Sequence, residues 1–478
     1  MRLQLAKEAS LYGASQVFVA AVGLVVVAIA TRTLAKSEYG EVAIAISVGT
    51  LLSIIFGMSL DTSISRYYYD PAWPEGRLYR SVVSGLWRVI AVGALLSGTI
   101  SAGIAIFISS PRFLVISLLV IIWASSEAFL TPAMTLVRMR RDVGKFVTIF
   151  VTSRCVGPIV TVALLLMYSS SVSYVVGLVV GSTTGLMLSR SLAGVNKLNH
   201  ESNDEIDVRS LLRFSLPLVP SSLAMLVNSN LDRWTLGAIA GLDEVAVYSV
   251  SAQLTFAAQL VVSAFALSFG PQSMQLIQSS RDEASVQLSS YLRMYVFWSS
   301  VSVVGLTAVC PKLIQVIATD EYTRASRVVG ILAISTVLFG ITYFTTLGSW
   351  KVGHSFDYSV AILIGVCGNA VLNVVLVPRL QAVGASLATL TGTTVTVLIS
   401  ALFSHRRYRY RLGYLRVLLA LSFTCLSVWF LSLESIVGFS NESDAIGRLV
   451  VLIVFSLITT LVLYAPEWFT KIARSNRS

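Results

Sequence analysis

Blocks of about 20 apolar residues follow one another along this chain, separated by short polar stretches. That is the length an α-helix needs to cross the ~30 Å hydrocarbon core of a bilayer. The composition agrees, because 55% of the residues are hydrophobic and only 12% are charged. A soluble chain of 478 residues would need far more polar surface. With no β-barrel alternation present, the sequence predicts an all-α integral membrane protein with about 14 transmembrane helices.

The predicted spans follow the apolar blocks. They are 10–31, 41–60, 84–109, 113–137, 146–168, 172–189, 214–236, 245–270, 291–318, 328–349, 355–377, 382–404, 414–433 and 446–464. The longest polar linker, 190–211, follows the sixth span.

The distribution of Lys and Arg predicts the orientation, because cationic loops resist translocation. With the N-terminus in the cytoplasm, the inner segments hold roughly three times as many Lys and Arg residues as the outer ones. The first apolar block follows Arg2 and Lys7 and is too long for a signal-peptide core, so we expect an uncleaved first span. Both termini are therefore predicted to be cytoplasmic.

The net charge of +11 does not call for nucleic acid as a partner. The run HisArgArgTyrArgTyrArg (405–411) mixes basic and aromatic residues as nucleic-acid-binding proteins do. It falls in a predicted cytoplasmic loop, however, where anionic headgroups and topology explain it.

No catalytic or metal-binding constellation stands out. The four cysteines lie far apart, without a CxxC or Cys/His cluster. His200, His354 and His405 fall in predicted cytoplasmic loops, and none pairs with a Ser or Cys nucleophile. We expect a protein that is not an enzyme, with no catalytic residues, metal or cofactor.

An internal repeat predicts two halves. ThrArgThrLeuAlaLysSerGluTyrGlyGluValAla (31–43) follows the first span, and AspArgTrpThrLeuGlyAlaIleAlaGlyLeuAspGluValAlaValTyrSer (232–249) follows the seventh. Each has an Arg, a short turn and an acidic–hydrophobic–small entry into the next span. Transporters built from such repeats bind substrate between the halves. We expect one six-helix lobe at 1–205, a second at 206–405, and two additional helices with a cytoplasmic tail at 406–478.

Three segments carry a resemblance to polysaccharide (O-antigen type) flippases. ArgThrLeuAlaLysSerGluTyrGly (32–40) resembles their Arg-x-Leu-Gly-x-x-x-Tyr-Gly element, and AspThrSerIleSerArgTyrTyr (61–68) resembles the element after their second helix. LeuLeuArgPheSerLeuProLeuValProSerSerLeu through AsnSerAsnLeuAspArgTrpThrLeuGly (211–237) resembles their seventh helix. Ala35 and Ala246 stand where Gly is common. The resemblance covers essentially the whole chain.

The resemblance implies the fold of the multidrug/oligosaccharidyl-lipid/polysaccharide exporter superfamily, with two six-helix lobes around a central cavity and two extra C-terminal helices. It also implies a flippase that moves a polyprenyl-pyrophosphate-linked oligosaccharide across the cell inner membrane by alternating access, for O-antigen (lipopolysaccharide), capsule or exopolysaccharide synthesis. The expected partners are the lipid-linked oligosaccharide and membrane lipids, with a polysaccharide polymerase and chain-length proteins as further candidates. An Na⁺ or H⁺ gradient is a candidate driving force.

Arg154 is the sharpest candidate for substrate binding. It lies roughly 13 Å inside the fifth span at 1.5 Å per residue, where a charge is expensive. Pro158 follows four residues later and cannot donate to the carbonyl of residue 154, which predicts a bend there. A guanidinium at this depth could bind the pyrophosphate of the substrate. It could equally form a structural ion pair with Glu127, which the hairpin places at nearly the same depth.

Further candidates are less specific. Arg88 could reach the inner headgroups or the cavity, and Arg66, beside Tyr67 to Tyr69, could anchor the interface or meet the pyrophosphate at entry. Asn228 and Asp232 share one helix face, which suits sugar hydroxyls or a coupling ion; a local Asp232–Arg233 pair is the alternative. Gly177, Gly181 and Gly185 form a double GxxxG that we assign to helix packing.

Two other functions stay open, a multidrug or cation exporter of the same superfamily and a membrane polysaccharide polymerase or ligase. Three arginines (Arg88, Arg154 and Arg233) outnumber two acids within the spans, which favours an anionic substrate over a cation. A polymerase or ligase needs an outward loop with reactive side chains, whereas the charged outer loop 319–327 is small.

Overall fold

The computed structural model describes residues 2–437 except 69, 141, 193–206, 279, 353 and 355, together with isolated positions between 451 and 463. Within these residues all regular secondary structure is helical. Eleven of the described helices are long and apolar enough to cross a membrane. The predicted all-α membrane fold is therefore confirmed. The fourteenth predicted span, 446–464, lies mostly outside the described residues.

Most of the described helices match the predicted spans. The eleventh and twelfth spans correspond to α16 (Phe356–Arg407), which consists of two helices joined at a kink at Gln381, with φ 53° and ψ −131°. The seventh span is not among the eleven apolar helices. It is divided into α9 (Val208–Ser215), a 3-10 turn η1 (Leu216–Leu218) and α10 (Val219–Ile239). Pro217 lies in that turn and Pro220 just after it, and a proline removes a helical donor.

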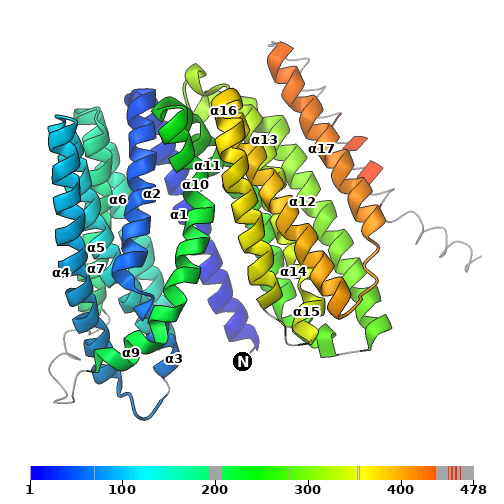
Figure 1. Ribbon diagram of the computed structural model, residues 1–478, viewed down its shortest axis with the longest axis horizontal. Coiled ribbons are helices and arrows are strands. Elements are labelled where there is room, and N and C mark those ends of the chain that lie inside the picture. Colours follow the sequence, from blue (N-terminus) through cyan, green and yellow to red (C-terminus); the bar gives the residue numbers. More distant parts are fainter. Residues whose placement is uncertain are drawn as a thin grey trace, which may run out of the picture. The chain divides into compact units, whose positions relative to one another are not determined.

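The chain divides into two compact units, Met1–Trp234 and Thr235–Ser478. The lobe boundaries predicted from the sequence stay a prediction. In the first unit α4, α5, α6 and α7 pack as a bundle (Figure 1). Besides α9, η1 and most of α10, its helices are α1 (Arg2–Thr33), α2 (Lys36–Gly57), α3 (Leu60–Tyr67), α4 (Glu75–Phe107), α5 (Pro111–Met139), α6 (Val143–Met167) and α7 (Ser171–Leu192).

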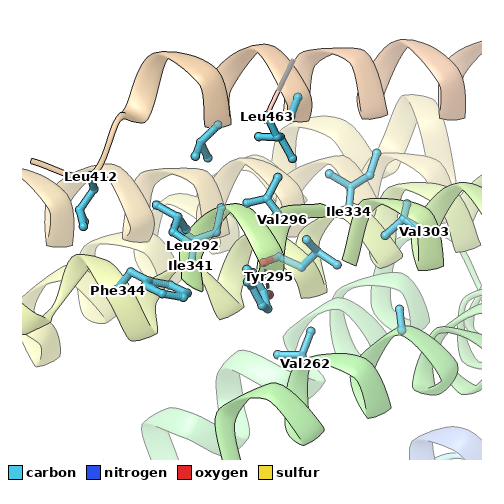
Figure 2. Packing of buried hydrophobic residues seen from close by; sticks show 14 of the residues in the cluster. Val262, Leu292, Tyr295, Val296, Val303, Ile334, Ile341, Phe344, Leu412 and Leu463 are labelled. Atoms are coloured by element: carbon cyan, nitrogen blue, oxygen red, sulfur yellow. Dashed lines mark hydrogen bonds between the residues drawn. The ribbon is translucent and has the colours of Figure 1, made fainter. Parts of the chain in front are cut away.

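The second unit packs α12 against α11, α13 and α17. Besides α16, its helices are α11 (Leu242–Gln278), α12 (Arg281–Ile317), η2 (Asp320–Tyr322), α13 (Ala325–Gly340), α14 (Thr342–Thr345), α15 (Leu347–Lys351) and α17 (Tyr414–Val437). Tyr295 lies at the centre of its core and donates a hydrogen bond to the Val337 carbonyl at 2.7 Å (Figure 2). The rings of Phe269 and Phe344 pack beside it, 4.5 Å apart.

Glycines allow backbone contact between α6 and α7 in the first unit, and between the two parts of α16 on either side of Gln381 in the second. A Cβ atom added to Gly157 of α6 would lie 2.9 Å from the Gly177 carbonyl oxygen of α7, and one added to Gly181 would lie 2.7 Å from the Ser153 carbonyl oxygen. In the second unit, a Cβ atom on Gly365 would lie 2.6 Å from the Gly392 carbonyl oxygen. The packing role predicted for the GxxxG glycines agrees with these contacts, and the two units share the device.

A cluster of polar groups recurs at one end of each unit. In the first unit Arg112 of α5 binds Glu38 of α2 and lies 3.0 Å from Ser171 Oγ of α7, which donates to Glu41 at 2.6 Å. In the second unit Glu244 of α11 binds Arg324 Nη1 at 3.0 Å, beside the start of α13. The other oxygen of Glu244 accepts from the backbone N–H of residue 382 at 3.2 Å. Because equivalent helices are joined, the contacts follow the repeat seen in the sequence.

Candidate functional site: an ion pair inside the first unit

Glu127 of α5 and Arg154 of α6 form an ion pair within the apolar part of the first unit. Arg154 Nη2 lies 3.0 Å from Glu127 Oε2. The two side chains are unequally covered, because Glu127 is 14% exposed and Arg154 is 41% exposed. The acid is therefore held among the helices while much of the guanidinium stays accessible. The pairing expected from the hairpin is present.

The packing of α6 fixes the direction of Arg154. Ser153 and Gly157 are buried on the face that contacts α7, and a Cβ atom on Gly185 would lie 2.5 Å from Ser153 Cβ. Arg154 is one residue further, about 100° around the helix, so it is turned away from that crowded face. The helix continues through Pro158 to Met167.

The start of α6 is also fixed. Asp142 caps the helix, accepting a hydrogen bond from the backbone N–H of Lys145 at 3.1 Å and an ion pair from its ammonium group at 2.8 Å. The hydrogen bond from the Lys145 side chain, followed by that from its backbone, lowers the pKa of Asp142. A capped first turn holds the register of the helix that carries Arg154.

Arg88 and Arg66 lie on other helices than this pair, on α4 and α3. Arg88 is exposed on α4, and because α4 begins at Glu75 rather than at 84, it lies further into its helix than we predicted. Arg66 is exposed on the short α3, and its guanidinium carbon lies 5.8 Å from the centre of the Tyr67 ring. Within the part of the chain that the structure describes, no hydrogen bond or ion pair links either residue to Arg154, and their substrate roles stay predictions.

The polar residues of α10 include one that the sequence analysis did not single out. Asp232 is 3% exposed and Asn228 is half-buried. Asn230, which was not among the candidate residues, is 7% exposed and accepts from Arg233 Nη1 at 3.0 Å. Trp234, near the same end of α10, donates a hydrogen bond from its Nε1 to Ser47 Oγ of α2 at 2.8 Å. Sequence reasoning missed Asn230 because its partner lies one turn away, although the i, i+3 spacing was a usable signal.

The structure offers no metal centre among the residues it describes. No three His, Cys, Asp or Glu side chains there form a group that could hold a metal ion. The four cysteines are free thiols.

The family follows from comparison with known proteins. The profile of the polysaccharide biosynthesis protein family matches residues 5–277, which is more than half of the chain. The chain belongs to this family. The match includes Glu127, Arg154 and the whole of α10, and no curated protein matches the sequence.

Solved structures with the same fold are membrane transporters. The lipid II flippase MurJ in an inward closed conformation matches with a TM-score of 0.70 and 17% identity, covering 95% of this family member and 99% of MurJ. An inward-facing multidrug resistance MATE transporter of the MOP superfamily matches with a TM-score of 0.57, 12% identity and coverage of 80% and 94%. The Vibrio cholerae MATE transporter VcmN in its bent form gives 0.51, 14%, 86% and 98%. At these identities the likeness establishes the fold, the one the sequence resemblance implied.

Proposed function

We propose that this protein is a flippase that moves a polyprenyl-pyrophosphate-linked oligosaccharide across the cytoplasmic membrane by alternating access. The observation that carries the proposal is the unequal Glu127–Arg154 pair, 14% and 41% exposed in a bundle of apolar helices. Membership of a polysaccharide biosynthesis family and the fold shared with a lipid II flippase support it. Both termini would be cytoplasmic, and export would serve O-antigen, capsule or exopolysaccharide synthesis.

Arg154 would bind the pyrophosphate of the lipid carrier. A guanidinium presents parallel N–H donors that match two phosphate oxygens, and such charge-assisted bonds are stronger in a dry site than in water. Glu127 would hold the guanidinium in place when substrate is absent, because an arginine left alone in the bundle would be costly. The substrate would then replace or share that partner, and release on the far side would restore the pair.

The driving force and partners remain part of the proposal. Asp232 and Asn228 supply oxygen atoms on one face of α10, which suits a coupling Na⁺ or H⁺. Replacing Asp232 by Asn would then abolish the dependence of flipping on an imposed ion gradient while leaving gradient-independent flipping measurable. A polysaccharide polymerase and chain-length proteins would take up the product on the outer side.

The test is flipping in proteoliposomes loaded with a fluorescent polyprenyl-pyrophosphate oligosaccharide, read by loss of outer-leaflet label. Arg154→Ala is expected to slow flipping at least about tenfold, because hydrogen bonds to charged groups contribute ~1.5–3 kcal/mol each. Arg154→Lys should retain part of the rate, since it keeps the charge but loses the planar fork. Wild-type flipping by correctly folded Arg154→Ala protein would overturn the role of Arg154, and absence of flipping by the wild-type protein would overturn the proposed function.

Arg140→Ala is the matched control. It removes the same charge and breaks an ion pair, with Glu75, but lies where α5 ends. Flipping should be nearly unchanged in this variant. A parallel assay of cationic dye efflux separates the exporter alternative: efflux that survives Arg154→Ala, without flipping by the wild type, would favour a drug or cation exporter.

A further inference from the structure

Three arginines line one pocket in the second unit. The pocket has a volume of about 490 Å³ and is formed by α12 and the chain entering α17. Arg293, Arg411 and Arg416 are three of its seven lining residues, and none of the seven is acidic. No residue that we assigned to the transported substrate belongs to it.

The segment before α17 directs one of these arginines into the pocket. Tyr410 and Leu412 are 6% and 2% exposed, and Leu412 belongs to the core of the unit (Figure 2). Arg411, between them, is exposed, and its backbone N–H donates to Ser285 Oγ at 3.1 Å. Tyr410 and Leu412 point into the core, and the Arg411 backbone is hydrogen-bonded to α12. The Arg411 side chain therefore lies on the face of the segment that is turned away from the core, where it lines the pocket.

The first turn of α17 adds charge of the same sign. Gly413 has φ +64°, a conformation that favours glycine, and α17 begins at the next residue. The first N–H groups of a helix lack intrahelical partners and give that end a partial positive charge. Arg416 lies in this turn. The guanidinium groups and the helix end therefore favour the same kind of ligand, an anion.

The opposite wall is provided by α12. Arg293 Nη1 donates to Ser289 Oγ at 3.4 Å, one turn earlier on the same helix, and both residues line the pocket. The acids of this helix, Asp282 and Glu283, are exposed in its first turn. They are about 15 Å from Arg293 along the helix axis at 1.5 Å per residue, too far to neutralise it.

The pocket lies where polar helix surface gives way to apolar surface. Polar residues dominate α12 up to Arg293, and the apolar part of α17 begins directly after Arg416. Leu415, a lining residue, is 72% exposed, and Leu418 and Leu419 of the next turn are 57% and 53% exposed. A polar–apolar boundary on neighbouring membrane helices is where lipid headgroups lie. The ligand should therefore be an anion with an apolar part.

We propose that this arginine pocket binds the phosphate headgroup of an anionic membrane phospholipid, with the acyl chains over the exposed leucines of α17. The guanidinium groups of Arg293, Arg411 and Arg416 bind the phosphate oxygens, and the end of α17 reinforces them. The inference is independent of flipping, because it concerns a lipid that stays bound to the second unit. It also gives the basic run at 405–411 a defined contact, through its last residue.

Native mass spectrometry of the full-length protein in detergent tests this site. The protein is titrated with dioleoylphosphatidylglycerol, with zwitterionic dioleoylphosphatidylcholine, and with glycerol phosphate as the soluble counterpart. We expect the phosphatidylglycerol to bind at least about tenfold more tightly than either of the others, since charge-assisted bonds and apolar contact act together.

Arg411→Ala should weaken phosphatidylglycerol binding by about tenfold, and Arg411→Lys by less. Arg411 is exposed, so the fold should tolerate both changes. Arg409→Ala is the matched control, because Arg409 is exposed on the same segment, is not a lining residue, and contacts Arg281 only through its backbone carbonyl in the bond at 2.6 Å. An equal loss in Arg409→Ala would reduce the effect to general surface charge and overturn the proposal. Equal binding of glycerol phosphate would reassign the pocket to soluble phosphates, and equal binding of phosphatidylcholine would remove the role of charge.

Discussion

The backbone contact between α6 and α7 predicts that replacing Gly181 by Ala destabilises the protein, whereas the same replacement at the exposed Gly103 stabilises it. A Cβ atom added to Gly181 would meet the Ser153 carbonyl oxygen at 2.7 Å and Gly157 Cα at 2.9 Å. Both are backbone atoms, so the helices must separate, at a cost of ~1–3 kcal/mol for overpacking. Replacing a helical Gly by Ala returns roughly 0.5–1 kcal/mol of backbone entropy. We therefore expect Gly181→Ala to destabilise the protein by about 1–2 kcal/mol.

Gly103→Ala is the matched change in open space. Gly103 is exposed on α4, and nothing lies within 4 Å of an added Cβ atom. Only the entropy gain applies, so this variant should be stabilised by about 0.5–1 kcal/mol. Both variants are measured by reversible unfolding in mixed micelles followed by circular dichroism. Gly181→Ala protein as stable as Gly103→Ala would refute the close approach of α6 and α7.

Three further predictions concern stability. Glu244→Ala should cost ~2–3 kcal/mol, because Glu244 is 7% exposed and accepts from the buried backbone N–H of residue 382. Arg324→Ala should cost a similar amount, because it leaves the buried Glu244 carboxylate without its cation; a loss under ~0.5 kcal/mol in chemical unfolding of either variant would be the contrary result. Gln381→Gly should raise the thermal midpoint, since φ 53° with ψ −131° is strained for any residue with a side chain; a lowered midpoint would mean that the bond from Arg324 outweighs the strain. Burial raises the pKa of Asp61 above its ordinary value, against hydrogen bonds from its own and the next backbone N–H and the charge of Arg138. The protonated folded form is thus favoured, stability falls as pH rises from the unfolded pKa through the folded one, and Asp61→Asn should flatten that part of the stability–pH curve.

The membrane fold was predictable because it depends on local features. Apolar blocks of span length mark most of the long helices among the described residues, whereas a span broken by local chemistry was harder to predict. The seventh span carries Pro217, Pro220 and the polar residues of α10, so length and hydropathy alone describe it poorly. The break between the eleventh and twelfth spans was predicted at 378–381, but the conformation of Gln381 was not. A non-glycine residue at positive φ depends on tertiary contacts, such as the bond from Arg324, rather than on its own preference.

The candidate site was predictable only where one charge stood out against an apolar block. Arg154 and Glu127 could be found this way, and the hairpin between their helices implied their common depth. The bond between Asn230 and Arg233 and the pocket around Arg293 and Arg411 depend on side-chain directions and on distant segments meeting. In the sequence the arginines look like solvent-exposed charges or like the cationic residues that set membrane orientation, because no local pattern distinguishes them.

The repeat offers a direct test of whether the Glu127–Arg154 pair is needed for the fold. Matching Gly157 with Gly365 places Ile362 at the position of Arg154, and matching Arg112 with Arg324 places Phe339 at the position of Glu127. Phe339 and Ile362 are half-buried, as the charged pair is. At the corresponding positions the second unit thus carries two apolar residues, and apolar residues often stabilise a fold as well as a buried ion pair does.

Transplanting the apolar pair into the first unit separates structure from transport. The double variant Glu127→Phe with Arg154→Ile should fold with a free energy of unfolding within about 1 kcal/mol of the wild type, because both charges are removed together. The single variant Arg154→Ile should be less stable, since it leaves Glu127 buried without its partner. If the guanidinium binds substrate, the double variant will nevertheless fail to flip lipid-linked oligosaccharide. A stable double variant that flips at the wild-type rate would assign the pair to packing alone, and loss of folding in the double variant would assign it to structure.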